Sequence, residues 1–292
     1  MCGLYGAIGL GWNEGIIRAL AWANMERGTD STGFFDSTGK MIKCAECASD
    51  ALRKENINKW LDASCKGCEK LCRIPSWFIA GHTRAATRGK VNRQNSHPFR
   101  YGRIIGSHNG MVDSPNSYVV DSQYLFDSLN THKGDYNAAW SNLTGYWAVT
   151  WFDDAAFYVQ VHNGDLTVAK KGDVWYYSSS WAHLQSAIGI GDEVITLKEG
   201  ETFKFELVNG KIVRSELPKF VSSVSSYWVK KYGGYQSTST AYDWDDKMDS
   251  NKRHGKRKSY YEDNTNVAVK DYDAEWREAW ETYCTESEHS KL

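Results

Sequence analysis

The amino-acid sequence predicts a β-rich α+β domain with few helices, followed by a polar tail. Short β-branched or aromatic segments recur between residues 76 and 216, separated by Gly, Asp and Asn, which is typical of strands joined by turns. Amphipathic helical patterns are few and lie mainly in the first third of the chain. Beyond Pro218 the composition becomes polar and charged, which predicts a poorly ordered segment.

The first part of the chain contains most of the predicted helical sequence. The predicted elements are a strand at 1–10, a helix at 13–28, a hairpin at 33–43 and a helix at 49–62. The hairpin has its turn at Asp36–Gly39, and Gly28 suits the end of the first helix. The second helix is N-capped by Ser49 or Asp50.

The second part reads mostly as strands. They are expected at 76–87, 102–112, 146–154, 155–163, 166–171 and 174–180. A helix at 120–130 has Asp121 at its start. A hairpin spans 201–217, and its Asn209-Gly210 pair is the strongest turn signal in the chain.

Charge and hydropathy exclude several classes of protein. The 292 residues include 35 Lys and Arg against 36 Asp and Glu, so no basic footprint indicates nucleic-acid binding. No apolar run approaches the roughly 20 residues of a membrane span, and the N-terminus lacks the pattern of a secretory signal. We therefore expect a cytoplasmic protein that binds neither nucleic acid nor membrane, with its seven cysteines reduced.

The N-terminal sequence MCGLYGAIG places a cysteine directly after the initiator methionine. Removal of Met1 would expose Cys2 with a thiol and a free α-amine on one residue, and an N-terminal amine is a known activator of weak nucleophiles. An unperturbed α-amine titrates near about pH 7.7–8.0, which suits a general base. The alternative is that Cys2 is a small buried apolar residue on a strand.

Several further segments carry functional residue types in a fixed order. They are RGTDSTG (27–33), GHTRAATRG (81–89), NSHPF (95–99), SHNGMV (107–112) and VDSQ (120–123). From Met1 to about residue 215 the chain resembles the glutaminase domain of class II glutamine amidotransferases. The resemblance implies an N-terminal-nucleophile (Ntn) hydrolase fold, an αββα sandwich with antiparallel sheets. We therefore expect a glutaminase domain at 1–217 and a mostly disordered tail at 218–292.

The resemblance also implies roles for individual residues. Cys2 would be the nucleophile, with its α-amine as the base. The Asn109 side-chain amide and the Gly110 N–H would form the oxyanion hole. Arg84 would bind the substrate α-carboxylate, because guanidinium pairs bidentately with carboxylates, and Asp121 would bind the α-ammonium. The alternatives are an ordinary Asn-Gly turn, a surface arginine and a plain helix N-cap aspartate.

Other motif residues are expected to assist these groups. Thr87, in the same loop as Arg84, would add a hydrogen bond to the substrate. The residues expected to support the site rather than contact substrate are Arg27, Asp30, Gly33, His82 and His97. A histidine on a strand is more often structural than catalytic, so His82 and His97 are interpreted as structural.

The loop at 81–89 departs from the family pattern. Relatives commonly read GHTRWAT, whereas Ala85 stands at the tryptophan position here. The large ring in relatives helps to close the loop over glutamine and to separate ammonia from solvent. Alanine does not supply that ring, so loop closure and ammonia channelling are in question, and the space left suits a larger leaving group.

The remaining cysteines include two Cys-x₂-Cys pairs whose spacing matches a four-thiolate zinc site. The pairs are Cys44 with Cys47 and Cys65 with Cys68. The helix predicted at 49–62 would hold its ends about 20 Å apart at 1.5 Å per residue, which argues against one shared metal. We favour reduced thiols and no metal, with structural zinc as the alternative.

The expected function is hydrolysis of glutamine to glutamate and ammonia through a γ-glutamyl thioester on Cys2, without a cofactor. The ammonia would be supplied to a separate protein partner. The alternatives are hydrolysis of other γ-glutamyl compounds and a catalytically idle fold used as a binding or structural module. In the tail, Trp276, Trp280 and Tyr283 form an aromatic stripe at helical spacing. That short amphipathic helix would either dock on its own domain or bind a partner.

Overall fold

The computed structural model describes residues 2–66, 75–132 and 134–221. The described residues fall in the first of two units of the chain, Met1–Ser223 and Val224–Leu292. The second unit, with the predicted helix at Trp276, Trp280 and Tyr283, lies outside the described residues. Within the described part, no helix is both long and apolar enough to cross a membrane.

The first sheet has seven antiparallel strands, with β1 (Gly3–Ile8) at its centre. Strand β1 pairs with β10 on one side and with β4 on the other. The order is β11-β9-β10-β1-β4-β2-β3. The bounds of the other strands are Glu193–Thr196 (β11), Thr167–Lys171 (β9), Val174–Ser178 (β10), Phe78–Arg84 (β4), Ser31–Asp36 (β2) and Met41–Cys44 (β3). Cys2 therefore lies at the start of the central strand.

The second sheet has six antiparallel strands in the order β13-β12-β8-β7-β6-β5. Their bounds are Lys211–Glu216 (β13), Thr202–Val208 (β12), Phe157–His162 (β8), Gly145–Phe152 (β7), Ile104–Val112 (β6) and Phe99–Tyr101 (β5). Strand β7 pairs with β6 from Ile105 to Val112, whereas the short β5 pairs only with Ile104–Gly106. Beyond Gly106, no described strand pairs with the other edge of β6.

Period-two alternation on the strands builds separate cores on the two faces of each sheet. On β1, Leu4 and Ile8 belong to the core between the sheets, whereas Tyr5 and Ala7 belong to the core on the outer face. On β7, Phe152 faces the core between the sheets, and Trp151 faces the opposite side. Both sheets are therefore buried on both faces.

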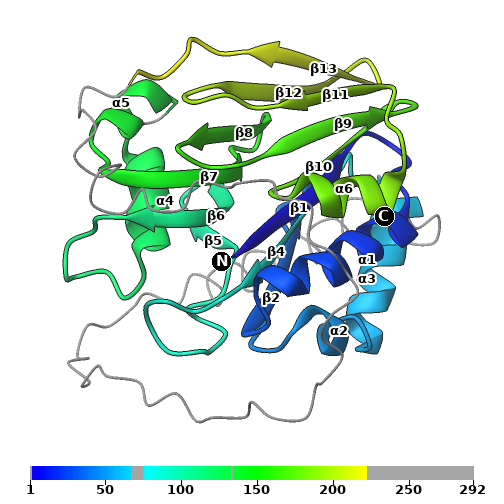
Figure 1. Cartoon of the computed structure of the whole chain (residues 1–292), viewed down its shortest axis with the longest axis horizontal. Coiled ribbons are helices and arrows are strands. Elements are labelled where there is room, and N and C mark those ends of the chain that lie inside the picture. The colour runs from blue at the N-terminus through cyan, green and yellow to red at the C-terminus, as the bar shows by residue number, and fades with distance from the viewer. Residues whose placement is uncertain (1, 67–74, 133, 222–292) are drawn as a thin grey trace, which may run out of the picture. The chain divides into compact units, whose positions relative to one another are not determined.

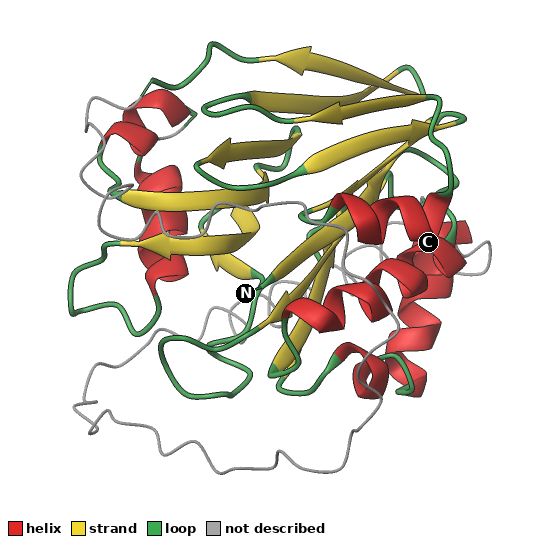
Figure 2. Ribbon diagram, in the orientation of Figure 1, coloured by secondary structure: helices red, strands yellow, loops and turns green. Residues whose placement is uncertain are grey.

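Helices cover the outer faces of the two sheets (Figures 1 and 2). The first sheet is covered by α1 (Glu14–Ala23), α2 (Ala48–Ala51), α3 (Glu55–Lys66) and α6 (Trp181–Ile188). The second sheet is covered by α4 (Asp121–Thr131) and α5 (Tyr136–Ser141). The order of layers is helix, sheet, sheet, helix, so the predicted α+β class and αββα sandwich are confirmed.

The single helix predicted at 49–62 is wrong. The chain forms α2 and α3 instead, separated at residues 52–54. A continuous helix at about 100° per residue would place Ala48 and Leu52 opposite Ile57 and Leu61. All four side chains are buried in the same core, so the helix must break to bring both apolar groups to one side. The straight helix that argued against zinc is therefore absent.

Most other predicted elements are found within a few residues of their expected bounds. Asn209 and Gly210 both have positive φ, 50° and 75°, as the hairpin turn between β12 and β13 requires. The helices α5 and α6 and the strands β5 and β11 were not predicted, and the end of the helix predicted at 13–28 is a 3₁₀ helix at Asn24–Arg27. Ser180, at the end of the strand predicted at 174–180, caps α6 by accepting a hydrogen bond from the His183 N–H at 3.5 Å.

Gly33 on β2 is expected to tolerate no side chain. A Cβ at this position would lie 2.0 Å from the His97 carbonyl oxygen, which is backbone. Gly33→Ala should lower the free energy of unfolding by at least about 2 kcal/mol, because β2 and the backbone at His97 must move apart to make room for the methyl group. Urea denaturation measures this. Gly15→Ala, at an exposed position in the first turn of α1, is the control and should change stability by less than about 1 kcal/mol. Equal stability of the two variants would contradict this packing.

Candidate active site

A cleft open to solvent lies where the start of β1 approaches the second sheet and α4. Its walls come from the N-terminus, the loop after β4, the segment before β5, the open edge of β6 and the beginning of α4. The lining residues are Cys2, Arg84, Ala85, Thr87, Arg88, Asn95, His97, His108, Gly110, Val120, Asp121 and Ser122. Segments far apart in sequence therefore contribute to one site.

The Cys2 thiol is half-buried in this cleft. Its Sγ lies 3.6 Å from the Ala85 carbonyl oxygen. Burial raises the pKa of the Cys2 thiol, and the Ala85 hydrogen bond and the nearby Arg84 guanidinium partly offset that effect. A thiol is a weak nucleophile until it loses its proton. Reaction at Cys2 therefore requires a nearby proton acceptor.

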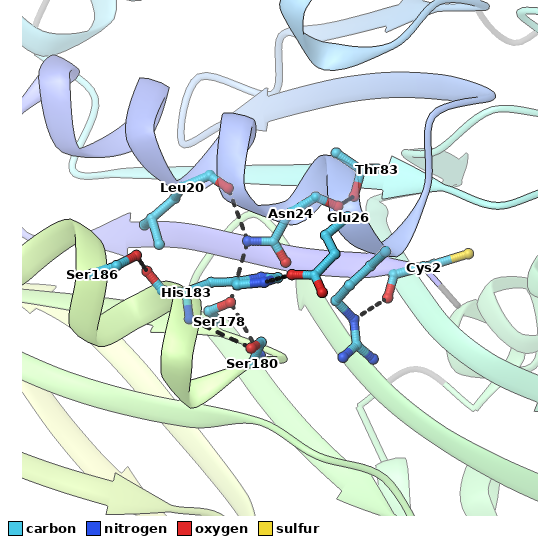
Figure 3. Close-up of polar contacts among 10 residues, drawn as sticks. Cys2, Leu20, Asn24, Glu26, Thr83, Ser178, Ser180, His183 and Ser186 are labelled. Carbon is cyan, nitrogen blue, oxygen red and sulfur yellow. Dashed lines mark hydrogen bonds and ion pairs between the residues drawn. The ribbon is translucent and has the colours of Figure 1, made fainter. Parts of the chain in front are cut away.

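The Cys2 backbone carbonyl is held by Arg27, on the side away from the sulfur. Arg27 Nε donates a hydrogen bond to the Cys2 carbonyl oxygen at 2.8 Å. Figure 3 shows the Cys2 sulfur directed away from the polar groups that surround this carbonyl. Behind them, Asn24 Nδ2 donates to Leu20 O at 2.9 Å, and Thr83 Oγ1 donates to Asn24 O at 2.7 Å. These bonds hold the end of α1 and the 3₁₀ helix against β4.

The loop after β4 folds around the Arg84 side chain. Arg84 Nη1 lies 3.4 Å from Lys90 O, and Nη2 donates to Arg88 O. Asp30 fixes the start of the loop, because its N–H donates to Arg84 O at 2.9 Å and its Oδ2 accepts from Ala86 N at 2.7 Å. Burial lowers the pKa of Arg84, but a guanidinium remains charged at neutral pH. The cleft therefore contains a fixed positive charge.

The open edge of β6 presents backbone groups to the cleft. In an antiparallel ladder, alternate residues bond to the partner strand and the others direct N–H and C=O away from it. Asp113 N donates to Thr144 O at 2.8 Å, in register with the β6–β7 ladder. Odd-numbered residues of β6 therefore bond to β7, and even-numbered residues direct their backbone groups to the open edge.

Two contacts agree with this assignment and place Gly110 between them. His82 Nε2 lies 3.1 Å from the His108 carbonyl oxygen, and Val112 N donates to Asp121 Oδ2 at 3.0 Å. The Gly110 N–H points to the same edge. Gly110 has φ of 146°, and a Cβ there would lie 2.1 Å from a backbone carbonyl oxygen of β7, so only glycine fits.

Asp121 is the first residue of α4 and faces the cleft. Its Oδ1 accepts from the Ser122 N–H at 3.0 Å, in addition to the bond from Val112. These backbone bonds fix the carboxylate in the wall of the cleft. Arg84 and Asp121 thus supply opposite charges in one cleft.

The structure brings six of the eight candidate residues to this cleft: Cys2, Arg84, Thr87, His97, Gly110 and Asp121. Asn109 precedes Gly110 on β6 but is not among the lining residues. Strand alternation places it on the face of β6 that contains Ile105, toward the first sheet. Arg27 contacts the Cys2 backbone from behind.

Sequence reasoning did not single out several cleft residues. Arg88 belongs to the quoted loop 81–89, and its Nη1 donates to Ser114 Oγ at 2.6 Å while its Nη2 donates to Tyr118 O at 3.0 Å. His108 belongs to the quoted SHNGMV segment, and Ser122 to VDSQ. Their motifs were recognised, but no spacing rule indicated that these side chains share a wall of one cleft.

Metal binding has no support among the described residues, which contain no group of three or more His, Cys, Asp or Glu side chains placed to hold an ion. Cys44 and Cys47 are free thiols there. Cys68 lies outside the described residues, and nothing is described of the Cys65 side chain. The four-cysteine zinc site therefore stays an alternative prediction.

The chain is similar to several known proteins. No protein-family model matches the chain. The isomerizing glutamine–fructose-6-phosphate aminotransferase of Buchnera aphidicola subsp. Acyrthosiphon pisum (strain APS) is 28% identical over 109 residues, which cover 35% of this chain and 16% of that protein. The structure of glutamine phosphoribosylpyrophosphate amidotransferase from B. subtilis, complexed with ADP and GMP, gives a TM-score of 0.55 at 16% identity. It covers 74% of this chain and 49% of that chain.

A second structure, described as the allosteric regulatory enzyme of purine biosynthesis, gives a TM-score of 0.55 at 17% identity, with the same coverage of 74% and 49%. The chain thus spans less than half the length of these relatives. At these identities the likeness shows the fold. The resemblance to class II glutamine amidotransferases is therefore confirmed at the level of the fold.

Arg84→Met should raise the pH at which Cys2 becomes reactive. The Arg84 guanidinium favours the thiolate, so its removal leaves the effect of burial less opposed and raises the thiol pKa further. The midpoint of the pH dependence of Cys2 alkylation by iodoacetamide, followed by mass spectrometry of the N-terminal peptide, measures this. Arg103→Met, at an exposed turn outside the cleft, is the control and should leave the midpoint unchanged. A midpoint that stays constant or falls in Arg84→Met would contradict the electrostatic assignment.

Proposed function

We propose that this chain is a glutaminase domain that hydrolyses the side-chain amide of glutamine to glutamate and ammonia. The observation that carries the proposal is the content of the cleft. A thiol, a guanidinium, a carboxylate and an outward-facing glycine N–H line it together. Amide hydrolysis by acyl transfer needs a nucleophile, a donor for the oxyanion and groups that orient the substrate. The fold shared with an amidotransferase supports the same proposal.

The proposed reaction proceeds through a thioester on Cys2. After removal of Met1, the α-amine of Cys2 accepts the thiol proton, directly or through one water, and Sγ attacks the γ-carbonyl carbon of glutamine. The Gly110 N–H and the Asn109 side-chain amide stabilise the oxyanion. The proton passes to the amide nitrogen, the carbon–nitrogen bond breaks and ammonia leaves. Water then attacks the thioester, which releases glutamate and restores the thiol.

Charge in the cleft supports recognition of a free amino acid. Arg84 is proposed to bind the α-carboxylate, and Asp121 the α-ammonium. Thr87, exposed on the loop that follows Arg84, is proposed to add a hydrogen bond. Opposite charges at separate positions favour a zwitterion over a ligand with one charged end. The long contact between Arg84 Nη1 and Lys90 O leaves donors that a carboxylate can use.

The fate of the ammonia is also a proposal. We propose transfer to a separate protein partner that the C-terminal segment binds. Phe220 is buried in the core beside Trp147, and its N–H donates to Gly200 O at 3.0 Å. A truncation that tests the segment should therefore end after residue 223, so that the first compact unit is kept.

Cys2→Ala is expected to remove glutamine hydrolysis. Loss of the nucleophile should lower kcat by a factor on the order of 10³ or more, because the remaining groups orient the substrate without forming a thioester. Glutamate release from glutamine, with and without the variant, measures this. Cys47→Ala, which removes a half-buried thiol outside the cleft, is the matched control and should retain wild-type activity.

Equal glutamate release by wild type and Cys2→Ala would contradict the proposed function. Such a result would favour the alternative of a catalytically idle fold used as a binding or structural module. Intact mass belongs to the same experiment, because the mechanism requires the wild-type chain to have lost Met1.

Hydrolysis of other γ-glutamyl compounds is a second candidate, supported by the cleft wall. Ala85 lines the cleft beside the Cys2 sulfur, where a small side chain leaves space for a leaving group larger than ammonia. Arg88, a second guanidinium in the wall, adds positive charge that suits a carboxylate on the leaving group. A γ-glutamyl dipeptide combines the same glutamyl group with such a leaving group.

Ala85→Trp should shift preference toward glutamine if this space is used. The indole would occupy the leaving-group side of the cleft, so the ratio of kcat/KM for γ-glutamylglycine to that for glutamine should fall by about 10-fold or more. Comparing hydrolysis of both substrates by the two proteins measures the ratio. An unchanged ratio would show that the leaving group does not lie against Ala85.

A further inference from the structure

Three histidines that the proposed mechanism does not use form a buried cluster beside the cleft. They are His82 of β4, His97 just before β5 and His108 of β6. Ring centroids lie 3.9 Å apart for His82 and His97 and 6.4 Å apart for His97 and His108. Ser122 of α4 completes the cluster, since its Oγ lies 2.9 Å from His97 Nε2 and 3.0 Å from His108 Nδ1. All four residues are at most 4% exposed.

The three imidazoles are neutral at neutral pH. Burial lowers the pKa of His82 to about 3 and holds the pKa of His97 well below its usual range. Burial also lowers the pKa of His108, and Asp121 opposes that effect. Each ring therefore carries one N–H and one lone pair, and the hydrogen-bond partners decide which nitrogen holds the proton.

The contacts restrict the tautomers. His82 Nε2 faces the His108 carbonyl oxygen, which only accepts, so His82 carries its proton on Nε2. Ser122 has one hydroxyl proton, so it donates to one of its two imidazole partners and accepts from the other. Either His97 donates to Ser122 and Ser122 donates to His108 Nδ1, or both bonds run in the reverse direction.

The surroundings of the two remaining nitrogens favour the first direction. His97 Nδ1 has no partner among the described residues, and the His97 ring packs against the rings of His82 and Phe99. In either direction one ring N–H has no protein partner, on His97 Nδ1 or on His108 Nε2. His108 Nε2 lies beside Gly110 at the open edge of β6, where a ligand acceptor can satisfy it, so the unpaired N–H is placed on that nitrogen. In the first direction Nδ1 carries only a lone pair, and the proton of His108 is on Nε2.

His108 Nε2 lies beside the Gly110 edge. It too has no partner among the described residues, and His108 lines the cleft. A Cβ built on Gly110 would lie 3.0 Å from this nitrogen. A buried N–H without a protein partner next to a substrate-binding edge gains a hydrogen bond only when a ligand supplies an acceptor.

We propose that His108 Nε2–H donates a hydrogen bond to the γ-carbonyl oxygen of the substrate, beside the Gly110 N–H, and that Ser122 and His97 hold His108 in this tautomer. The proposal rests on the proposed function and adds one catalytic residue and two positioning residues to it. The donor is neutral, so it stabilises the developing oxyanion without competing for the proton of the Cys2 thiol. Asn109 approaches from the other face of β6, so the two side chains do not occupy the same place.

A double-mutant cycle on glutamine hydrolysis tests this. His108→Phe should lower kcat, and with it kcat/KM, by about 10- to 100-fold with a smaller change in KM, because the bond strengthens in the transition state. Ser122→Ala should have a smaller effect, since it removes the constraint on the tautomer and not the donor. The double variant should be no slower than His108→Phe alone, because Ser122 acts through His108.

A matched control and a direct readout accompany the cycle. Ser128→Ala removes another buried hydroxyl of α4, which donates to Ala139 O at 3.4 Å. This variant should leave kcat unchanged. The ¹⁵N chemical shifts of the His108 ring should report the Nε2–H form in the wild type and a mixture of tautomers in Ser122→Ala. If His108→Phe does not fold, His108→Gln and the wild-type spectrum provide the test.

Additive effects of His108→Phe and Ser122→Ala would overturn the proposal, as would an Nδ1–H tautomer of His108 in the wild type. A folded His108→Phe protein within about twofold of wild-type kcat would overturn it too. Absence of any Cys2-dependent hydrolysis in the wild type is a different failure. It would overturn the proposed function, and the substrate contact with it, while the ¹⁵N tautomers would still decide the hydrogen-bond order among His97, Ser122 and His108.

Discussion

The rest of the site depends on one constraint, which is the fixed position of the Cys2 backbone at the start of the central strand. Strand β1 is paired on both sides, and its beginning is held further by Ser179, whose N–H donates to Leu4 O at 2.8 Å. Arg27 holds the Cys2 carbonyl from the opposite side of the sulfur. A residue at a chain end normally has several accessible conformations. Here strand pairing and one guanidinium restrict it, so the sulfur faces the Ala85 loop.

The second requirement is an open edge on the other sheet. Strand β5 is only three residues long, so it leaves β6 unpaired from Ser107 onward on that side. The N–H of Gly110 is therefore available to a ligand, and the beginning of α4 places Asp121 at the same edge. Three layers of the sandwich each contribute one part: the first sheet supplies the thiol, the second sheet supplies the backbone donor, and helix α4 supplies the carboxylate. This explains why residues from widely separated motifs share one cleft.

The fold class and most of the cleft residues could be predicted from the sequence, for different reasons. Period-two strands and the Asn209-Gly210 turn are local patterns, so they are readable without a structure. Arg84, Gly110 and Asp121 came from ordered motifs that a known family shares. Local helix propensity does not predict the break between α2 and α3. The break occurs because the apolar residues of both helices are buried in the same core. The partnership of His108 with Ser122 depends on the packing of α4 against β6, which no single segment encodes.

In the proposed mechanism, the Cys2 sulfur forms a covalent bond to the γ-glutamyl group of the substrate. The most direct measurement is peptide mass spectrometry of wild-type protein quenched in acid during turnover of glutamine. We expect an N-terminal peptide that begins at Cys2 and gains the mass of one γ-glutamyl group, which hydroxylamine removes. An N-terminal peptide that remains unmodified while glutamate is released, or an adduct on another residue, would contradict it.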